Sequence, residues 1–133
     1  MAVYVTDTHP LLWYAGGHHA KLSKKVLRIF NEAMRDQALI YVPAVVLWEV
    51  ALLDKGRRIQ LREPFDQWAS ALLSRRGFDL APLDLPVVVE AVTLSFNDDP
   101  FDAAIVATAR VNDLPLITKD VEITDAQMVE VAW

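Results

Sequence analysis

Short apolar runs alternate along this chain with longer segments in which apolar residues recur at helical spacing. The short runs are rich in β-branched and aromatic residues, as buried strands are. The longer segments begin near Ser, Asp or Pro and end near Gly or Asn, which are common helix boundaries. Strands are expected at about 2–6, 39–42, 78–83, 115–118 and 128–133. Helices are expected at about 9–15, 24–36, 43–54, 64–76, 86–95 and 100–111.

Regular alternation of strands and helices predicts an α/β fold with a parallel sheet covered by helices on both faces. At 133 residues, the chain has the length of one domain, 1–133, and can bury a core without disulfides. No repeat, linker or low-complexity tract divides it.

Four acidic residues sit beside apolar runs, where burial is unfavourable unless something neutralises their charge. Asp7 follows the first expected strand, and Asp120 follows a later one by two residues. Asp102 lies at the start of a helix, and Glu49 lies about two turns into another. Because ligand sites of parallel α/β sheets form beyond the carboxyl ends of the strands, these side chains are expected to share one site.

Clustered carboxylates suit Mg²⁺ or Mn²⁺, which prefer oxygen ligands and can activate water for hydrolysis of a phosphodiester. Structural explanations exist for most of the acids taken singly. Asp7 can cap a helix, Asp99 and Asp102 fit the start of a helix that begins with Pro100, and Asp120 fits a turn. Glu49 has no capping role, although an ion pair or an exposed helix face could accommodate it.

Composition narrows the class of protein. Apolar residues make up 53% and charged residues 23%, so a disordered chain is not expected. The absence of cysteine excludes disulfides and thiolate chemistry and fits a cytoplasmic location. No run is long enough to span a membrane, and no signal peptide is expected.

The net charge of −5 is unevenly distributed. Residues 1–82 hold 11 Lys/Arg and 8 Asp/Glu, a balance of +3, whereas residues 83–133 hold 2 and 10, a balance of −8. The basic residues between the third and fourth helices could attract a polyanion or could be a solvated helix end and loop. These residues are Lys55, Arg57, Arg58 and Arg62.

Four segments, in order and suitably spaced, resemble the PIN-domain family, and specifically the VapC-type ribonuclease toxins of toxin–antitoxin pairs. The segments are Asp7-Thr8-His9-Pro10-Leu11-Leu12-Trp13, Leu47-Trp48-Glu49-Val50-Ala51, Asp99-Pro100-Phe101-Asp102 with the apolar helix after it, and Leu116-Ile117-Thr118-Lys119-Asp120. The resemblance covers essentially the whole chain. It implies a Rossmann-like three-layer α/β/α sandwich whose parallel sheet has four or five strands.

The same resemblance implies an endoribonuclease that depends on Mg²⁺ or Mn²⁺ and cleaves RNA through metal-activated water. Asp7, Glu49 and Asp102 would be the principal metal-site acids, with Asp120 a fourth and Asp99 an accessory acid. Asp125 is an alternative to Asp120. Thr6, Thr8 and Thr118 could hydrogen-bond these carboxylates, and Lys119 could touch phosphate.

Partners are implied as well: a VapB-like antitoxin whose C-terminal segment inhibits the enzyme, and a second copy of the chain in a homodimer. Trp13, Trp48 and Trp68 fall on apolar helical faces that suit a core or a dimer interface. Two alternatives remain at this point. One is a catalytically weak RNA- or partner-binding module on the same scaffold, and the other is a phospho-acceptor receiver domain, for which the expected acid pair is lacking.

Overall fold

The computed structural model describes residues 1–133 and contains a five-stranded sheet in which all strands are parallel. The strand order is β3-β2-β1-β4-β5, which confirms the predicted α/β class with a parallel sheet. The strands are β1 (Ala2–Thr6), β2 (Ala38–Pro43), β3 (Phe78–Ala81), β4 (Leu116–Ile117) and β5 (Val131–Ala132).

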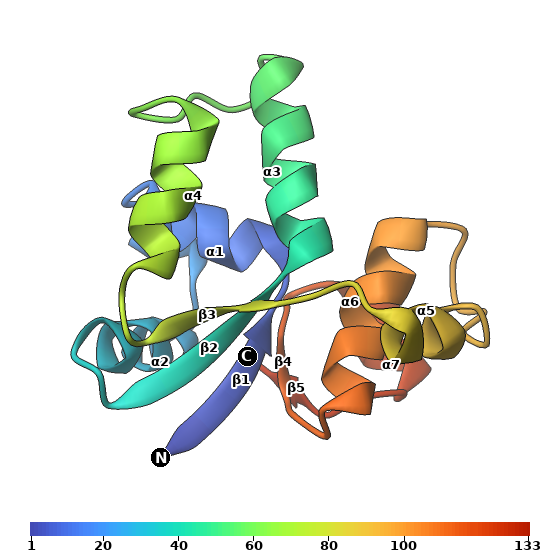
Figure 1. The fold of residues 1–133 in the computed structure, drawn as a ribbon. Helices are drawn as coiled ribbons and strands as arrows, with labels where there is room; N and C mark the ends of the chain where they lie inside the picture. Colours follow the sequence, from blue (N-terminus) through green and yellow to red (C-terminus); the bar gives the residue numbers. More distant parts are fainter.

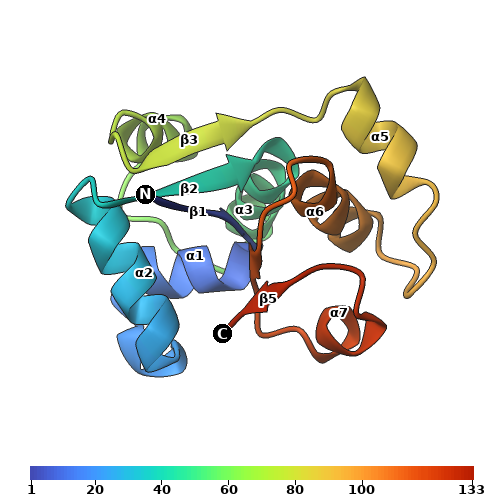
Figure 2. The ribbon, with the colours of Figure 1, turned by 90° about the horizontal axis from the view of Figure 1, so that it is seen from below.

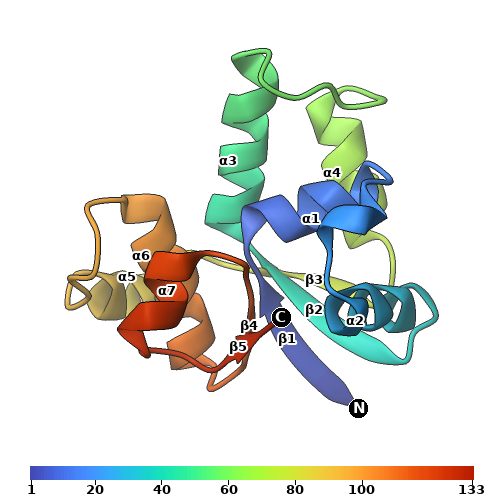
Figure 3. The same cartoon turned by 180° about the vertical axis from the view of Figure 1, so that it is seen from behind.

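Seven α-helices and one short 3₁₀ helix connect the strands. They are α1 (Thr8–Ala15), η1 (His19–Lys21), α2 (Lys24–Met34), α3 (Ala44–Lys55), α4 (Phe65–Leu73), α5 (Leu85–Ala91), α6 (Pro100–Val111) and α7 (Val121–Ala126). Helices α1 and α2 lie on one side of the sheet, and α5, α6 and α7 lie on the other (Figures 2 and 3). Helices α3 and α4 form a hairpin that rises beyond the carboxyl ends of the strands (Figure 1).

Side-chain caps set several helix boundaries where the sequence placed them. The Ser23 side chain accepts a hydrogen bond from the Val26 amide at the start of α2, and Asp84 does the same for the Val87 amide at the start of α5. Glycine at position 56 follows α3 directly, as expected.

The core forms one cluster of 21 buried apolar residues drawn from the sheet and from both helical layers. Phe30 of α2 and Ile105 of α6 are fully buried in it, on opposite sides of the sheet. Burial of both faces explains why the strands read as continuous apolar runs rather than as an alternating pattern. No helix is long and apolar enough to cross a membrane.

The predicted boundaries are wrong mainly in the second half of the chain. Helix α5 ends at Ala91 rather than near residue 95, and β4 and β5 have two residues each. Helix α7 was not predicted; Asp120 caps its first turn, and Gln127 ends it with a left-handed φ of 53°. A helix of six residues is too short to show a helical period in sequence.

The pairing of β1 with β4 brings the segments that follow the two strands close together. Val5 lies opposite Leu116 and Thr6 opposite Ile117, so the residues that follow these strands leave the sheet side by side. The Asp7 amide continues this pairing by donating a 2.9 Å hydrogen bond to the Ile117 carbonyl. The chain crosses from β1 to β2 on one side while β4 lies on the other, so this edge is a topological switch point.

Candidate active site

Asp7 occupies the carboxyl end of β1, and its side chain is only 9% exposed. Its Oδ1 accepts a 2.8 Å hydrogen bond from the Thr8 amide, which makes Asp7 the N-cap of α1. Its Oδ2 accepts a 2.8 Å hydrogen bond from the Thr118 hydroxyl. The capping role foreseen for Asp7 therefore coexists with a position at the switch point of the sheet.

Burial is the largest influence on Asp7 and raises the pKa of its carboxyl group above the ordinary value. The hydrogen bonds from Thr118 and Thr8 stabilise the charged form and lower the pKa, in that order of size. The negative charge of Glu49 raises it again, and His9 lowers it slightly. Asp7 is thus a buried acid without a cationic partner in an ion pair.

Glu49 comes from α3 and is half-buried beside α1. Its Oε1 accepts a short hydrogen bond from the Thr8 hydroxyl. Thr8 therefore links two acids, because its amide donates a hydrogen bond to Asp7 and its hydroxyl donates one to Glu49. The packing of α1 against α3 accounts for an acid in the middle of an apolar helix.

Asp102 belongs to the first turn of α6 and is half-buried. Its Oδ2 accepts a 2.9 Å hydrogen bond from the Asn97 side chain. Burial, acting with the charges of neighbouring acids, raises the pKa of Asp102 to about 7, against the lowering effect of Asn97. The acids that raise this pKa are Asp99, Asp7 and Asp120, in that order.

The remaining acids have clear structural roles. Asp99 caps α6 through hydrogen bonds from the Phe101 and Asp102 amides, and Asp120 caps α7 through the Ile123 amide. Both also act electrostatically on Asp102. Asp125 is exposed on α7 and is not among the groups that shift the pKa of Asp102.

Two of the three threonines hold carboxylates as foreseen. Thr118 donates to Asp7 and Thr8 donates to Glu49. Thr6 differs: its hydroxyl donates a 2.9 Å hydrogen bond to the backbone carbonyl of Asp7, not to a carboxylate. Thr6 is the last residue of β1, so its side chain lies on the buried surface of the sheet.

The donor set consists of carboxylate oxygens, which hard divalent cations prefer. None of these carboxylates is neutralised by a basic side chain, since the two ion pairs of the structure are Arg28–Glu32 and Arg110–Glu90. In chemistry and charge the residues fit Mg²⁺ or Mn²⁺. Their present positions do not form a ready coordination group, because no three His, Asp or Glu side chains are placed to hold a metal ion.

Only two of the basic residues expected to contact RNA line the same pocket. Lys55 ends α3, and Arg57 follows with a left-handed φ of 58°. Arg58 and Arg62 line a pocket beside α1, whereas Lys55 and Arg57 do not. Lys119 follows β4, and its Nζ lies 5.9 and 6.0 Å from the ring centroids of Trp13 and Trp133.

Asn97 was missed in the sequence. Its Nδ2 donates to Asp102, and its Oδ1 accepts a 3.0 Å hydrogen bond from the Asp99 amide. This residue therefore ties the loop before α6 to two acids of the site. An asparagine in a polar loop carries no signal that separates it from an ordinary turn residue.

Comparison with known proteins supports the same interpretation of the fold. The family model "PIN domain" matches residues 4–127. "Ribonuclease VapC22" of Mycobacterium tuberculosis is 27% identical over 121 residues, which are 90% of this chain and 88% of that protein.

Two solved structures share the fold at low sequence identity. A crystal structure of VapBC2 from Rickettsia felis, bound to a DNA fragment from their promoter, matches with a TM-score of 0.71 at 13% identity, over 98% of this chain and 97% of that one. DNA-bound VapBC from Salmonella typhimurium matches with a TM-score of 0.69 at 13% identity, over 99% and 98%. Since the family model spans nearly all of the chain, this protein belongs to the PIN-domain family.

Proposed function

We propose that this chain is a metal-dependent endoribonuclease and the toxin of a VapBC-type toxin–antitoxin pair. The observation that carries the proposal is the arrangement at the carboxyl end of β1, where Thr8 hydrogen-bonds both Asp7 and Glu49 and no basic side chain pairs with these acids or with Asp102. Burial raises the pKa values of Asp7 and Asp102 in the same place. Strongly shifted acids in one place are typical of catalytic sites, and a bound cation would relieve their repulsion. Membership of the PIN-domain family and the similarity to a VapC ribonuclease point to RNA as the substrate.

In this proposal Asp7, Glu49 and Asp102 hold Mg²⁺ or Mn²⁺, and Asp120 completes the set. Asp99 is an accessory acid that also fixes the start of α6. Such a cation, when bound, lowers the pKa of water and stabilises negative charge on the phosphoryl oxygens.

The neighbouring hydroxyl and amide groups keep the carboxylates in place. Thr118 and the Thr8 amide hold the two oxygens of Asp7. The Thr8 hydroxyl holds Glu49, and Asn97 holds Asp102.

The test is RNA cleavage with Mg²⁺ or Mn²⁺, compared with cleavage in EDTA. Asp7→Asn and Asp102→Asn should each abolish cleavage without unfolding the chain, whereas Asp113→Asn, an exposed acid at the end of α6, should not. Cleavage that persists in both site variants would defeat the assignment. Metal-independent RNA binding without turnover would instead indicate a catalytically inactive binding module.

Comparing Asp120→Asn with Asp125→Asn identifies the fourth acid. Asp120 acts on Asp102 and follows β4 closely, so its substitution should lower cleavage strongly. Asp125 is exposed and acts on no acid whose pKa is shifted, so its substitution should leave cleavage near the wild-type level.

The partner proposed is an antitoxin with a basic C-terminal segment. Several of the solved structures that share this fold are complexes, among them a toxin–antitoxin complex from Klebsiella pneumoniae with a TM-score of 0.63. Excess acid in residues 83–133 suits a basic inhibitory segment. The product of a short neighbouring reading frame should co-purify with this chain and suppress cleavage, and it should do neither if the pairing is wrong.

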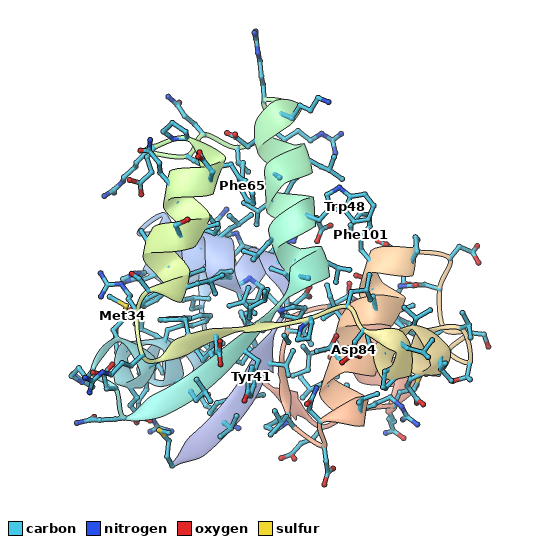
Figure 4. All side chains as sticks on the ribbon, viewed as in Figure 1. Met34, Tyr41, Trp48, Phe65, Asp84 and Phe101 are labelled. Atoms are coloured by element: carbon cyan, nitrogen blue, oxygen red, sulfur yellow. The ribbon has the colours of Figure 1, made fainter.

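We also propose a homodimer formed through apolar side chains of α3, α5 and α6. Trp48 of α3 is 58% exposed, and its ring lies 5.1 Å from that of Phe101 of α6 (Figure 4). Helix α5 packs on α6 and exposes Leu85 and Val89, and Val92 directly after the helix is exposed as well. Exposed apolar groups of this kind mark protein–protein contacts, and Trp48→Lys should shift the mass in light scattering from dimer to monomer.

A further inference from the structure

One pocket of the molecule is lined mainly by cations, in contrast to the carboxylate site. It is a pocket of about 670 Å³ bounded by α1, the segment after α1, the α3–α4 loop and α4. Figure 3 shows α1 running beside the lower part of α4, beneath this loop. The volume falls within the range of about 300–1,000 Å³ typical of small-ligand sites.

Four cationic side chains line this pocket and only one acid does. Lys21, Arg58, Arg62 and Arg75 supply the positive charge, and Glu63 is the acid. None of the four cations forms an ion pair within the protein. Unpaired cations around one hollow, in a chain whose net charge is −5, create a local site for an anion.

Aromatic rings line the same hollow. Trp13 and Trp68 are both partly exposed and belong to its wall. Lys21 Nζ lies 5.7 Å from the centroid of the Trp13 ring, and the Trp133 ring meets Trp13 edge-on at 6.3 Å. Proteins bind unpaired nucleotides by stacking the bases on aromatic rings and by contacting the phosphates with cationic side chains. This pocket offers both kinds of group.

The pocket opens next to the proposed catalytic acids. His9 lines it, and His9 is two residues after Asp7 and close enough to act on the Asp7 charge. A strand that placed a phosphate at Asp7 would therefore bring its adjoining nucleotide to the pocket mouth.

We propose that this pocket binds the nucleotide next to the scissile phosphate in an unpaired stretch of RNA. Arg58, Arg62 and Arg75 take its phosphate, and Trp13 takes its base. The proposal rests on the ribonuclease function above and adds to it the residues that hold the neighbouring nucleotide. It also assigns a role to Arg75, which the sequence did not single out as a basic candidate.

The experiment measures binding of a short fluorescein-labelled single-stranded RNA by anisotropy, in EDTA so that no cleavage occurs. The double variant Arg58→Ala/Arg75→Ala should weaken RNA binding about tenfold. It should also reduce the slope of log binding constant against log salt concentration by about 1.4, as expected for two lost phosphate contacts. The matched control is Arg28→Ala/Arg76→Ala, which removes the same charge from residues outside the pocket. That control should bind within about twofold of wild type.

Stacking has its own test, since Trp13→Leu should weaken single-strand binding about fivefold without changing the salt slope. Thermal melting checks that Trp13→Leu folds, and quenching of wild-type tryptophan fluorescence by RNA reports stacking without any substitution. Duplex RNA of the same sequence should bind equally well to wild type and to Trp13→Leu.

An equal loss of RNA affinity in the pocket double variant and in the control double variant would overturn the proposal, because the diffuse positive charge of the surface would then explain the binding. Displacement of the RNA by polyglutamate at matched charge would also overturn it and assign the pocket to an acidic protein segment. Failure of the ribonuclease proposal looks different: RNA would not be cleaved with Mg²⁺ or Mn²⁺, yet the pocket variants would still bind more weakly than the controls.

Discussion

The Thr118 hydroxyl donates a 2.8 Å hydrogen bond to Oδ2 of Asp7, a residue 111 positions away in the sequence. The register of β1 against β4 makes this contact, because both residues follow directly on the paired strands. Thr118 is fully buried, so water cannot replace its hydroxyl without rearrangement. The bond favours the charged form of Asp7 and opposes the effect of burial on its pKa.

Replacing Thr118 by Val should therefore raise the pKa of Asp7 further and reduce cleavage about 10–100-fold, the usual effect of losing a group that orients a metal ligand. Stability near neutral pH should fall by about 1–2 kcal/mol, because a buried acceptor loses its donor. Carboxyl-carbon NMR titration measures the pKa, and urea unfolding measures the stability.

The matched control for this change is Thr108→Val. Thr108 is equally buried, but its hydroxyl bonds the Ala104 carbonyl within α6 and touches no acid. It should leave the Asp7 titration and the cleavage rate unchanged. Equal effects of the two substitutions on cleavage would mean that Thr118 acts through packing alone.

The raised pKa of Asp102 predicts that the stability of the metal-free protein depends on pH. Its folded pKa is raised from 3.8 to about 7, so folding favours its protonated form. The stabilising contribution is complete below pH 3.8 and is lost as the pH rises from there through 7. Asp102→Asn removes this loss and should make the metal-free fold more stable at pH 8 by on the order of 1 kcal/mol after solvent screening. At pH 4 the two proteins should unfold at nearly the same urea concentration; a constant difference across this range would contradict the shifted pKa.

Most of the fold could be predicted from sequence because local signals coincide with it. Ser23, Asp84 and Asp99 mark helix starts by their side chains, and these caps are present. The exceptions are elements whose existence depends on tertiary contacts. The strand expected at 128–133 is present but has only two residues, because it pairs with the two residues of β4, and α7 is too short for a visible period.

The sequence predicts the edge of the sheet at which the acids lie, but it does not predict the hydrogen bonds that connect them. Parallel topology brings the ends of β1 and β4 together, so the sequence predicts Asp7 and Asp120 at the same edge of the sheet. The hydrogen bond from Asn97 to Asp102 depends on the path of the loop before α6, and the spacing of apolar residues in the sequence does not indicate that path. Arg75 reaches the basic pocket from beyond α4 for the same reason: helix packing, not spacing, sets its place.

Addition of Mg²⁺ or Mn²⁺ should raise the thermal midpoint of the wild-type protein, because a ligand that binds only the folded chain stabilises it. The rise should be larger at pH 8 than at pH 6, since protons compete with the metal for two acids with raised pKa values, Asp7 and Asp102. Asp7→Asn should remove most of the shift, and Asp113→Asn should retain it. The same shift in Asp7→Asn as in wild type would place the metal elsewhere on the molecule.

The two most informative glycines for the fold itself are Gly77 and Gly17. A Cβ atom at Gly77 would lie 1.9 Å from the backbone carbonyl oxygen of Ala33, so α2 and the start of β3 would have to separate. Gly77→Ala should therefore lower the free energy of unfolding by about 3 kcal/mol, at the upper end of the range for overpacking. Gly17 is the control: its φ is +77° but nothing lies within 4 Å, so Gly17→Ala should cost only about 1 kcal/mol through backbone strain. Urea unfolding of both variants measures the difference, and equal losses would show that α2 does not approach β3 as closely as described.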